Sequence, residues 1–240
     1  LQFVLRDPDF TEIPMNQIKT ELGSYVALYE INMDKNDAEH ISIPITDKLT
    51  KRWGITADQL YQDTIKVQAA WNQPLLADLL EMGTYLNGGT RPDNLLSADK
   101  IDDTGLYVLT NYKLYNGAAM IAHDEMAQKI GNLLQMDYYI LPSTVHELLV
   151  YPDNGVISIT QLQEMVKSVN ATDVLPKDRL SDKVLFYNQQ ERRLELATER
   201  EEYFEDKTED TQEKKELAEG KDKSESEKKE DKSLKFSIRL

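Results

Sequence analysis

The chain has 240 residues, a formal net charge of −15 and no cysteine. Such a charge opposes direct binding of nucleic acid, because no basic stripe interleaved with aromatic residues interrupts it. The lack of cysteine excludes disulfides, thiolate zinc sites and thiol catalysis, and no apolar run approaches the roughly 18 residues of a membrane-spanning helix. We therefore expect a cytoplasmic protein with no membrane or nucleic-acid partner, and the start at Leu1 indicates a fragment or a processed chain.

The first half of the chain predicts two strands, two helices and a loop. These are residues 24–31 and 40–45 as strands, 46–53 and 56–71 as helices, and 87–94 as the loop. Thr46 and Thr56 are suited to cap the two helices, and Gly54 ends the first of them. Pro44 favours an edge position for the second strand, because proline cannot donate a hydrogen bond to a neighbouring strand.

The second half predicts the order β-β-α-β-β-α-β. The expected segments are 105–111 and 116–122 as a strand hairpin, 123–134 as a helix, 137–141 and 144–152 as strands, 158–170 as a helix, and 180–188 as a strand or extended segment. Apolar residues recur at helical spacing in both helices, so each has one face suited to packing. This order predicts an α+β fold, with a mainly antiparallel sheet and helices packed on one face.

The composition changes near residue 189, where a mixed-charge tail begins. The tail carries 17 acidic and 13 basic residues, so most of the net negative charge belongs to the body before it. Too few apolar side chains follow for a packed core. The predicted division is residues 1–188 as one domain or two subdomains (1–95 and 100–188), 189–233 as a charged linker that is disordered or partly helical, and 234–240 as a short strand. The last segment alternates apolar and polar residues, and such a strand could add to a sheet edge of this chain or of a partner.

The sequence ILPSTVHELLVYP, residues 140–152, brings a hydroxyl, an imidazole and a carboxylate close together. A catalytic triad needs its base to touch both the nucleophile and the carboxylate. In a strand over 144–151 neighbouring side chains alternate faces, which separates His146 from Glu147. Thr144 would share a face with His146, but threonine is a rare nucleophile without a terminal amine. The turn that exposes a catalytic serine, Gly-x-Ser-x-Gly, is also missing.

Metal and cofactor sites are not predicted either. The His-Glu pair at 146–147 lacks the second histidine of the His-Glu-x-x-His motif, and His40, His123 and His146 are far apart in sequence. We instead expect His146 to be a structural histidine that donates to a backbone carbonyl or to a side chain such as Asn111. Glu147 is expected to cap a neighbouring loop or to pair with a lysine.

Several stretches resemble the C-terminal half of a domain family of unknown function, which occurs in gut Gram-positive bacteria and often lies beside conjugative and other mobile elements. They are GLYVLTNYKLYNGAAMI, YYILPSTVHELLVYPDNG and LQEMVKSVNATDVLPKDRLSDKVLFYN, with ISIPITDKLTKRWGITADQLYQDTIKV similar to an earlier part of the family. The resemblance covers roughly residues 22–188 and departs from the family pattern at Thr144, where the pattern has serine. It implies a shared fold and no particular reaction.

Two hypotheses about function follow. The first is a non-enzymatic interaction or accessory protein, associated with a mobile element and bound to an unidentified protein partner. The alternative is a hydrolase-type enzyme with a groove around Asn111, Ser143, His146 and Glu147. A structure separates them by showing whether these four side chains gather in a pocket or hold loops together.

Overall fold

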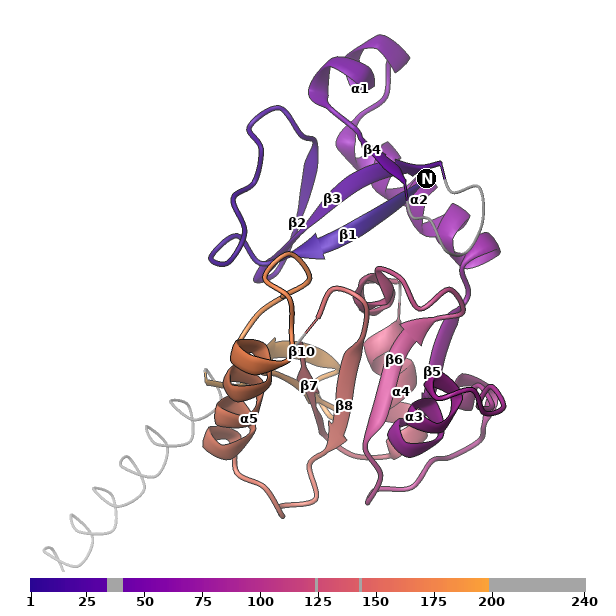
Figure 1. Ribbon diagram of the computed structural model, residues 1–240, viewed down its shortest axis with the longest axis vertical. Coiled ribbons are helices and arrows are strands. Elements are labelled where there is room, and N and C mark those ends of the chain that lie inside the picture. The colour runs from indigo at the N-terminus through magenta and orange to yellow at the C-terminus, as the bar shows by residue number, and fades with distance from the viewer. Residues whose placement is uncertain (34–40, 124, 143, 199–240) are drawn as a thin grey trace, which may run out of the picture. The chain divides into compact units, whose positions relative to one another are not determined.

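Two antiparallel sheets form the framework of the chain in the computed structural model shown in Figure 1. The structure describes residues 1–33, 41–123, 125–142 and 144–198. Within this part, Leu1–Ala197 form one unit. His40, Ser143, the greater part of the predicted linker and the predicted strand at 234–240 lie outside the described residues.

The first sheet is built around its longest strand, β3. Its strands are β1 (Gln2–Arg6), β2 (Lys19–Leu22), β3 (Tyr25–Asn32) and β4 (Ser42–Pro44). β1 pairs along one side of β3, while β2 and β4 follow one another along its other side. The side chains of Phe3, Val4 and Leu5 are buried, so β1 lies inside the core although it is the first element of the chain.

Two helices follow the first sheet at the predicted positions, α1 (Asp47–Trp53) and α2 (Ala57–Trp71). Thr56 caps α2, since its side chain accepts a hydrogen bond from the backbone N–H of Gln59. Gly54 ends α1 in the left-handed conformation with φ 71°, which glycine adopts without strain. α2 packs on the first sheet, where the Tyr61 ring stacks on Phe3 with 6.0 Å between centroids.

The second sheet has six strands in the order β10-β9-β7-β8-β6-β5, all antiparallel to their neighbours. The strands are β5 (Pro74–Asp78), β6 (Tyr107–Asn111), β7 (Tyr138–Leu141), β8 (Leu148–Pro152), β9 (Leu185–Asn188) and β10 (Arg193–Leu196). The accompanying helices are α3 (Leu79–Leu86), α4 (Met126–Leu134) and α5 (Ile159–Thr172), with short 3-10 helices η1 (Leu95–Ser97) and η2 (Gly117–Ala122). No helix among these described elements is long and apolar enough to cross a membrane.

Helices cover both faces of this second sheet. On one face, Tyr138 and Ile140 pack in the same core as Ile130 of α4. On the other face, Tyr139 packs against Leu162 of α5, and Met82 of α3 joins a further cluster on β5 and β6. The predicted α+β class with antiparallel sheets is confirmed, but the helices are not confined to one face as expected.

The predicted hairpin of residues 105–111 and 116–122 is wrong in its second half, which forms η2 instead of a strand. Gly117 lets η2 lie directly on the sheet: a Cβ there would be 2.2 Å from Thr110 Oγ1 and 2.4 Å from the His146 carbonyl oxygen. Ala118 and Met120 are fully buried. A short apolar run of this kind fits a buried helix as well as a buried strand.

The expected strand over 144–152 begins only at Leu148. The residues before it belong to the loop between β7 and β8, so strand alternation does not govern where their side chains point. Similarly, α5 buries Leu162 and Val166 as predicted, but Met165 and Val169 of the same predicted face are 45% and 42% exposed.

The second sheet continues past residue 188, where the charged linker was expected to begin. β10 pairs with β9 from Arg193↔Asn188 to Leu196↔Leu185, and Ala197 is fully buried. In β10 two leucines alternate with charged residues. The charged composition of this segment led to the prediction of a linker where the structure has a strand. The two subdomains predicted at 1–95 and 100–188 do not correspond to the two sheets, because β5 (Pro74–Asp78) belongs to the second sheet.

Candidate functional site

His146 lies where three loops meet: the β7–β8 loop, the loop after β6 and the loop after α5. Its Nδ1 accepts a hydrogen bond from the backbone N–H of Asn116 at 3.2 Å. Its Nε2 lies 3.4 Å from Asp178 Oδ1, and the Tyr115 ring packs on the imidazole with 5.1 Å between centroids. Because Nδ1 is an acceptor, the ring carries its proton on Nε2, facing the Asp178 carboxylate.

Thr144 organises the β7–β8 loop that carries His146. Its hydroxyl donates to Glu147 Oε1 at 2.7 Å and accepts from the backbone N–H groups of His146 and Glu147 at 3.0 and 3.2 Å. This is a local turn in which a threonine side chain replaces backbone partners. Glu147 was expected to cap a neighbouring loop or to pair with a lysine, but its carboxylate accepts from the Thr144 hydroxyl within its own loop.

Asn111 holds the loop after β6. Its side-chain amide donates to the carbonyl of Tyr115 at 2.8 Å, and its Oδ1 accepts from the backbone N–H of Lys113 at 3.0 Å. Asn111 is fully buried and makes no hydrogen bond to His146. It acts indirectly, because the loop that it holds presents the Tyr115 ring and the Asn116 N–H to the imidazole.

A half-buried arginine adds positive charge beside this junction. Arg6, at the end of β1, donates to the carbonyl of Lys177 at 2.9 Å. Burial lowers the pKa of Arg6 from its ordinary value, while the negative charges of Glu30 and Asp178 act in the opposite direction. Since the ordinary pKa of arginine is very high, the guanidinium stays charged. A residue of the first sheet therefore places a positive charge near Asp178, the partner of His146.

The junction at His146 is built to hold loops together. A general base needs a ring nitrogen that can take a proton from a nucleophile, and in a triad the other nitrogen faces the carboxylate. Here Asp178 faces Nε2, while Nδ1 is occupied by the Asn116 N–H. Of the four predicted site residues, His146 and Glu147 lie in the same loop. Asn111 holds the loop after β6, which contacts His146, and Ser143 lies outside the described residues. No group of three or more His, Asp or Glu side chains in the described part is placed to hold a metal.

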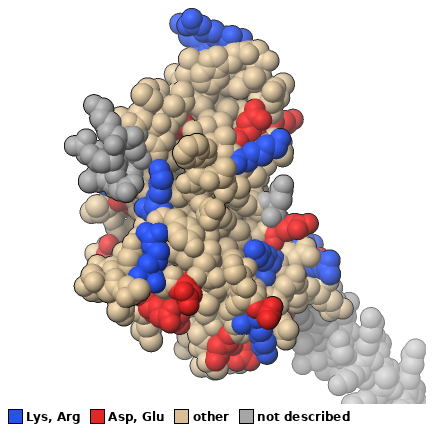
Figure 2. Space-filling model, turned by 90° about the vertical axis from the view of Figure 1, so that its right-hand side faces the viewer, with Lys and Arg blue, Asp and Glu red and all other residues tan. Residues whose placement is uncertain are grey.

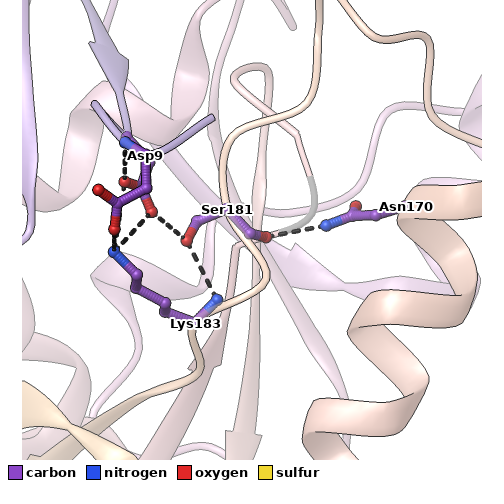
Figure 3. Close-up of polar contacts among 5 residues, drawn as sticks. Asp9, Asn170, Ser181 and Lys183 are labelled. Carbon is purple, nitrogen blue, oxygen red and sulfur yellow. Dashed lines mark hydrogen bonds and ion pairs between the residues drawn. The ribbon is translucent and has the colours of Figure 1, made fainter. Parts of the chain in front are cut away.

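A second polar cluster connects the segment after β1 to the segment before β9 (Figure 3). The Ser181 hydroxyl donates to Asp7 Oδ2 at 2.6 Å, and Lys183 Nζ lies 3.3 Å from the same oxygen and also bonds to Asp9. Asn170 of α5 donates to the Ser181 carbonyl at 2.8 Å. Asp7 and Ser181 are fully buried, so the serine cannot meet a substrate and the cluster is structural.

Lys183 is the cation of this buried cluster. Its hydrogen bond to Asp9 is the main cause that raises the pKa of Lys183 above its ordinary value of 10.5, and the contact with Asp7 adds to this. The sequence contains "LSDK" at 180–183 but offers no sign of the partners, which lie about 174 residues earlier. Only the tertiary structure could identify them.

Arg91 is an exposed charged side chain with several partners, and the sequence did not single it out. Its guanidinium carbon lies 5.2 Å from the ring centroids of both Tyr85 and Tyr112. Nη2 donates to the Tyr85 hydroxyl at 2.9 Å and to the Tyr112 carbonyl at 3.2 Å. Nη1 has no hydrogen bond to the described residues. The sequence placed Arg91 in the loop 87–94 without these partners, which come from α3 and from the end of β6.

Charges of both signs are dispersed over one face of the molecule. On the face drawn in Figure 2, Lys and Arg side chains alternate with Asp and Glu side chains across a largely uncharged area. No continuous basic stripe crosses this face, so it does not resemble a surface that tracks a nucleic-acid backbone.

Comparison with known proteins gives a family and no function. Residues 20–189 match a family of unknown function, DUF5688. No curated protein and no solved structure matches the chain. The matched range includes His146, Asp178 and Arg91, but begins after β1 and ends before β10.

Proposed function

The chain belongs to DUF5688, a family of unknown function, and we propose that it is a non-enzymatic interaction domain that binds an acidic segment of a protein partner through Arg91. The observation that carries this proposal is the stacking of Arg91 between Tyr85 and Tyr112 at the surface. Tyrosine and arginine are the residue types that most often dominate the energy of protein interfaces.

The two tyrosines hold Arg91 in advance of binding. A free arginine loses side-chain entropy when it is immobilised, which weakens binding by about 0.5–1.5 kcal/mol. Here hydrogen bonds and two rings already restrain Nε and Nη2. Nη1 remains available to a carboxylate, whose geometry suits the planar guanidinium.

The charges of the chain favour a short acidic protein segment over a long polyanion as the ligand of Arg91. Lys113, which follows Tyr112 directly in the sequence, is exposed as well. The net charge of −15 opposes a long polyanion such as nucleic acid. A short acidic segment presents carboxylates without bringing a large total charge toward the rest of the surface.

The geometry at His146 supports the non-enzymatic part of this proposal. The hydrolase alternative needs a histidine with one nitrogen directed at a nucleophile. His146 instead uses Nδ1 for the backbone of Asn116 and Nε2 for Asp178. Thr144 is likewise engaged by Glu147 and by two backbone N–H groups.

An accessory role alongside a mobile element, in the cytoplasm, extends the proposal. Its support is the resemblance described above and the cysteine-free composition. This extension rests on association and is independent of the Arg91 geometry.

The test is affinity capture with three forms of the full chain: unchanged, Arg91→Ala, and Arg52→Ala as a matched control. Arg52 is an exposed arginine on α1 that stacks on no aromatic ring of the described residues. We expect a protein that binds the unchanged chain and the control, and that binds Arg91→Ala at least tenfold more weakly when its affinity is then measured with purified components, since hot-spot truncations exceed about 1.4 kcal/mol. Equal capture by all three forms would contradict the site, and capture of nothing by any form would contradict the interaction role.

A further inference from the structure

The loop after β6 connects the His146 junction to the Arg91 stack. At its start, the ring and the carbonyl of Tyr112 contact the Arg91 guanidinium. At its end, the Tyr115 ring packs on the imidazole of His146, and the backbone N–H of Asn116 donates to Nδ1 of the same imidazole. Two residues separate Tyr112 from Tyr115, so a change at one end of this loop acts close to the other end.

Contacts with other groups hold the loop in a backbone conformation that its own residues do not favour. Leu114 and Asn116 have φ values of 54° and 52°, in the left-handed region that is uncommon for residues other than glycine. Such residues keep this conformation only where their surroundings impose it. Asn111 supplies part of the restraint, because its side chain binds the N–H of Lys113 and the carbonyl of Tyr115. The imidazole at the end of the loop supplies a further part.

The imidazole of His146 holds Asn116 only while Nδ1 carries no proton. Nδ1 accepts the backbone N–H of Asn116 at 3.2 Å, and Nε2 carries the ring proton toward Asp178 Oδ1 at 3.4 Å. A second proton goes to Nδ1 and turns this acceptor into a donor. Two N–H groups then face each other, so the hydrogen bond is lost. Histidine is the side chain whose charge ordinarily changes between about pH 5 and 8.

The charges around this imidazole come from several elements. Asp178, in the loop after α5, faces Nε2. Arg6 of β1 interacts electrostatically with Asp178, with Glu30 of β3 and with the Tyr115 hydroxyl. Glu147, the next residue of the β7–β8 loop, is bound by a hydroxyl of the same loop. Because a carboxylate faces the ring, the charge of a second ring proton is balanced, and its cost falls on the hydrogen bond at Nδ1.

We propose that protonation of His146 releases the end of the loop after β6 and thereby loosens the Arg91 stack. The Arg91 site is then ordered at neutral pH and weakened in mild acid. This regulation of binding rests on the proposed function of Arg91, whereas the change in the loop does not. A protonation equilibrium can control the loop in this way because the two ring states differ in the contact that they make with it.

Asn111 transmits the change from one end of the loop to the other. A single amide side chain holds both Lys113 and Tyr115, so the residues between them move together. The N–H of Tyr112 stays bound to the Gln73 carbonyl at 3.1 Å, and the loop turns about this point. The carbonyl and the ring of Tyr112 lie beyond it, and these are the groups that restrain the guanidinium.

The first test follows the full chain by NMR between about pH 7.5 and about pH 5, a range in which histidine titrates and ordinary carboxylates stay charged. We expect three signals to change with one midpoint: the ring of His146, the amide of Asn116 and the Nε–H of Arg91. A His146 ring that does not titrate in this range overturns the proposal. So does an Asn116 or Arg91 signal that stays constant while the ring titrates.

The second test is hydrogen exchange of the Asn116 amide, corrected for the intrinsic effect of pH, in three forms of the full chain. They are the unchanged chain, His146→Asn and His123→Asn. The asparagine in His146→Asn keeps an acceptor oxygen near the position of Nδ1 but takes up no proton in this range. His123→Asn removes a different histidine and leaves the junction intact.

We expect the Asn116 amide to be about tenfold less protected at pH 5 than at pH 7.5 in the unchanged chain and in His123→Asn. In His146→Asn the protection should be equal at both pH values. The same loss in all three forms would assign the change to another group and overturn the switch. Both tests use the protein without a partner, so their failure leaves the Arg91 proposal standing, and a failure of partner capture leaves the loop change standing.

Discussion

Gly117 shows how a single residue decides the structure of its region. It permits η2 to approach Thr110 and the backbone of His146 at distances that no side chain could occupy. The prediction of a strand at 116–122 was wrong, because the sequence shows a glycine at 117 but not the groups that this glycine contacts. By contrast, the roles of Thr56 and Gly54 were predicted correctly, because helix caps depend on residues only a few positions away.

Gly117→Ala should destabilise the protein by about 3 kcal/mol or more, since overpacking a tight core position generally costs 1–3 kcal/mol and this contact involves backbone. Urea unfolding followed by circular dichroism measures the change. Gly83→Ala is the control: a Cβ there meets nothing within 4 Å inside α3, so it should stabilise by about 0.5–1 kcal/mol. Equal effects of the two substitutions would show that the close approach at Gly117 does not matter.

Lys183 gives the buried cluster a definite pH dependence. The pKa of Lys183 is raised in the folded protein, chiefly by its hydrogen bond to Asp9. The contacts that raise this pKa contribute their full stabilisation of the fold below pH 10.5, the ordinary pKa of lysine. That stabilisation is lost as the pH rises through the pKa of the folded state. The stability difference between the unchanged chain and Lys183→Met should therefore shrink above about pH 10.5. Unfolding titrations at pH 8 to 12 measure it, and a constant difference would contradict the ion-pair account.

At the scale of elements, the matched family range and the folded unit do not coincide. The match begins at residue 20 and ends at 189, whereas β1 and β10 pair with β3 and β9 from outside it. β1 was not predicted, because a few apolar residues at the start of a sequence carry no period. Its burial depends on α2 and β3, which lie far along the chain. The candidate site could likewise be predicted only in part. The sequence indicated His146, but not its partner Asp178, which comes from the loop after α5.

A chain limited to residues 20–189 should not fold cooperatively. It lacks Phe3, Val4 and Leu5, each nearly fully buried, and each such side chain contributes about 1.5–3 kcal/mol. Total stabilities of domains are only about 5–15 kcal/mol. Thermal unfolding monitored by circular dichroism compares this chain with residues 1–198. A sharp transition of similar midpoint in both would show that β1 and β10 are dispensable.

At the scale of the whole described unit, one hydrophobic core spans both sheets. Buried residues of β1 and β3 belong to the same cluster as those of β7 and α4. The polar contacts at Arg6 and at Asp7 join the same two regions. The composition could not predict this joint core, because the core depends on contacts between distant parts of the chain.

The Asp7–Ser181 hydrogen bond sets an order of events during synthesis. Its two residues are 174 positions apart, and a ribosome adds about 5–20 residues per second, so Asp7 is added to the chain roughly 9–35 s before Ser181. During this interval β1 can pair with β3, but its buried carboxylate has neither the serine nor Lys183 to satisfy it. The Asp7 carboxylate of a nascent chain therefore lacks its partners until residues 181–183 emerge, and this is the period in which chaperones would meet the first sheet.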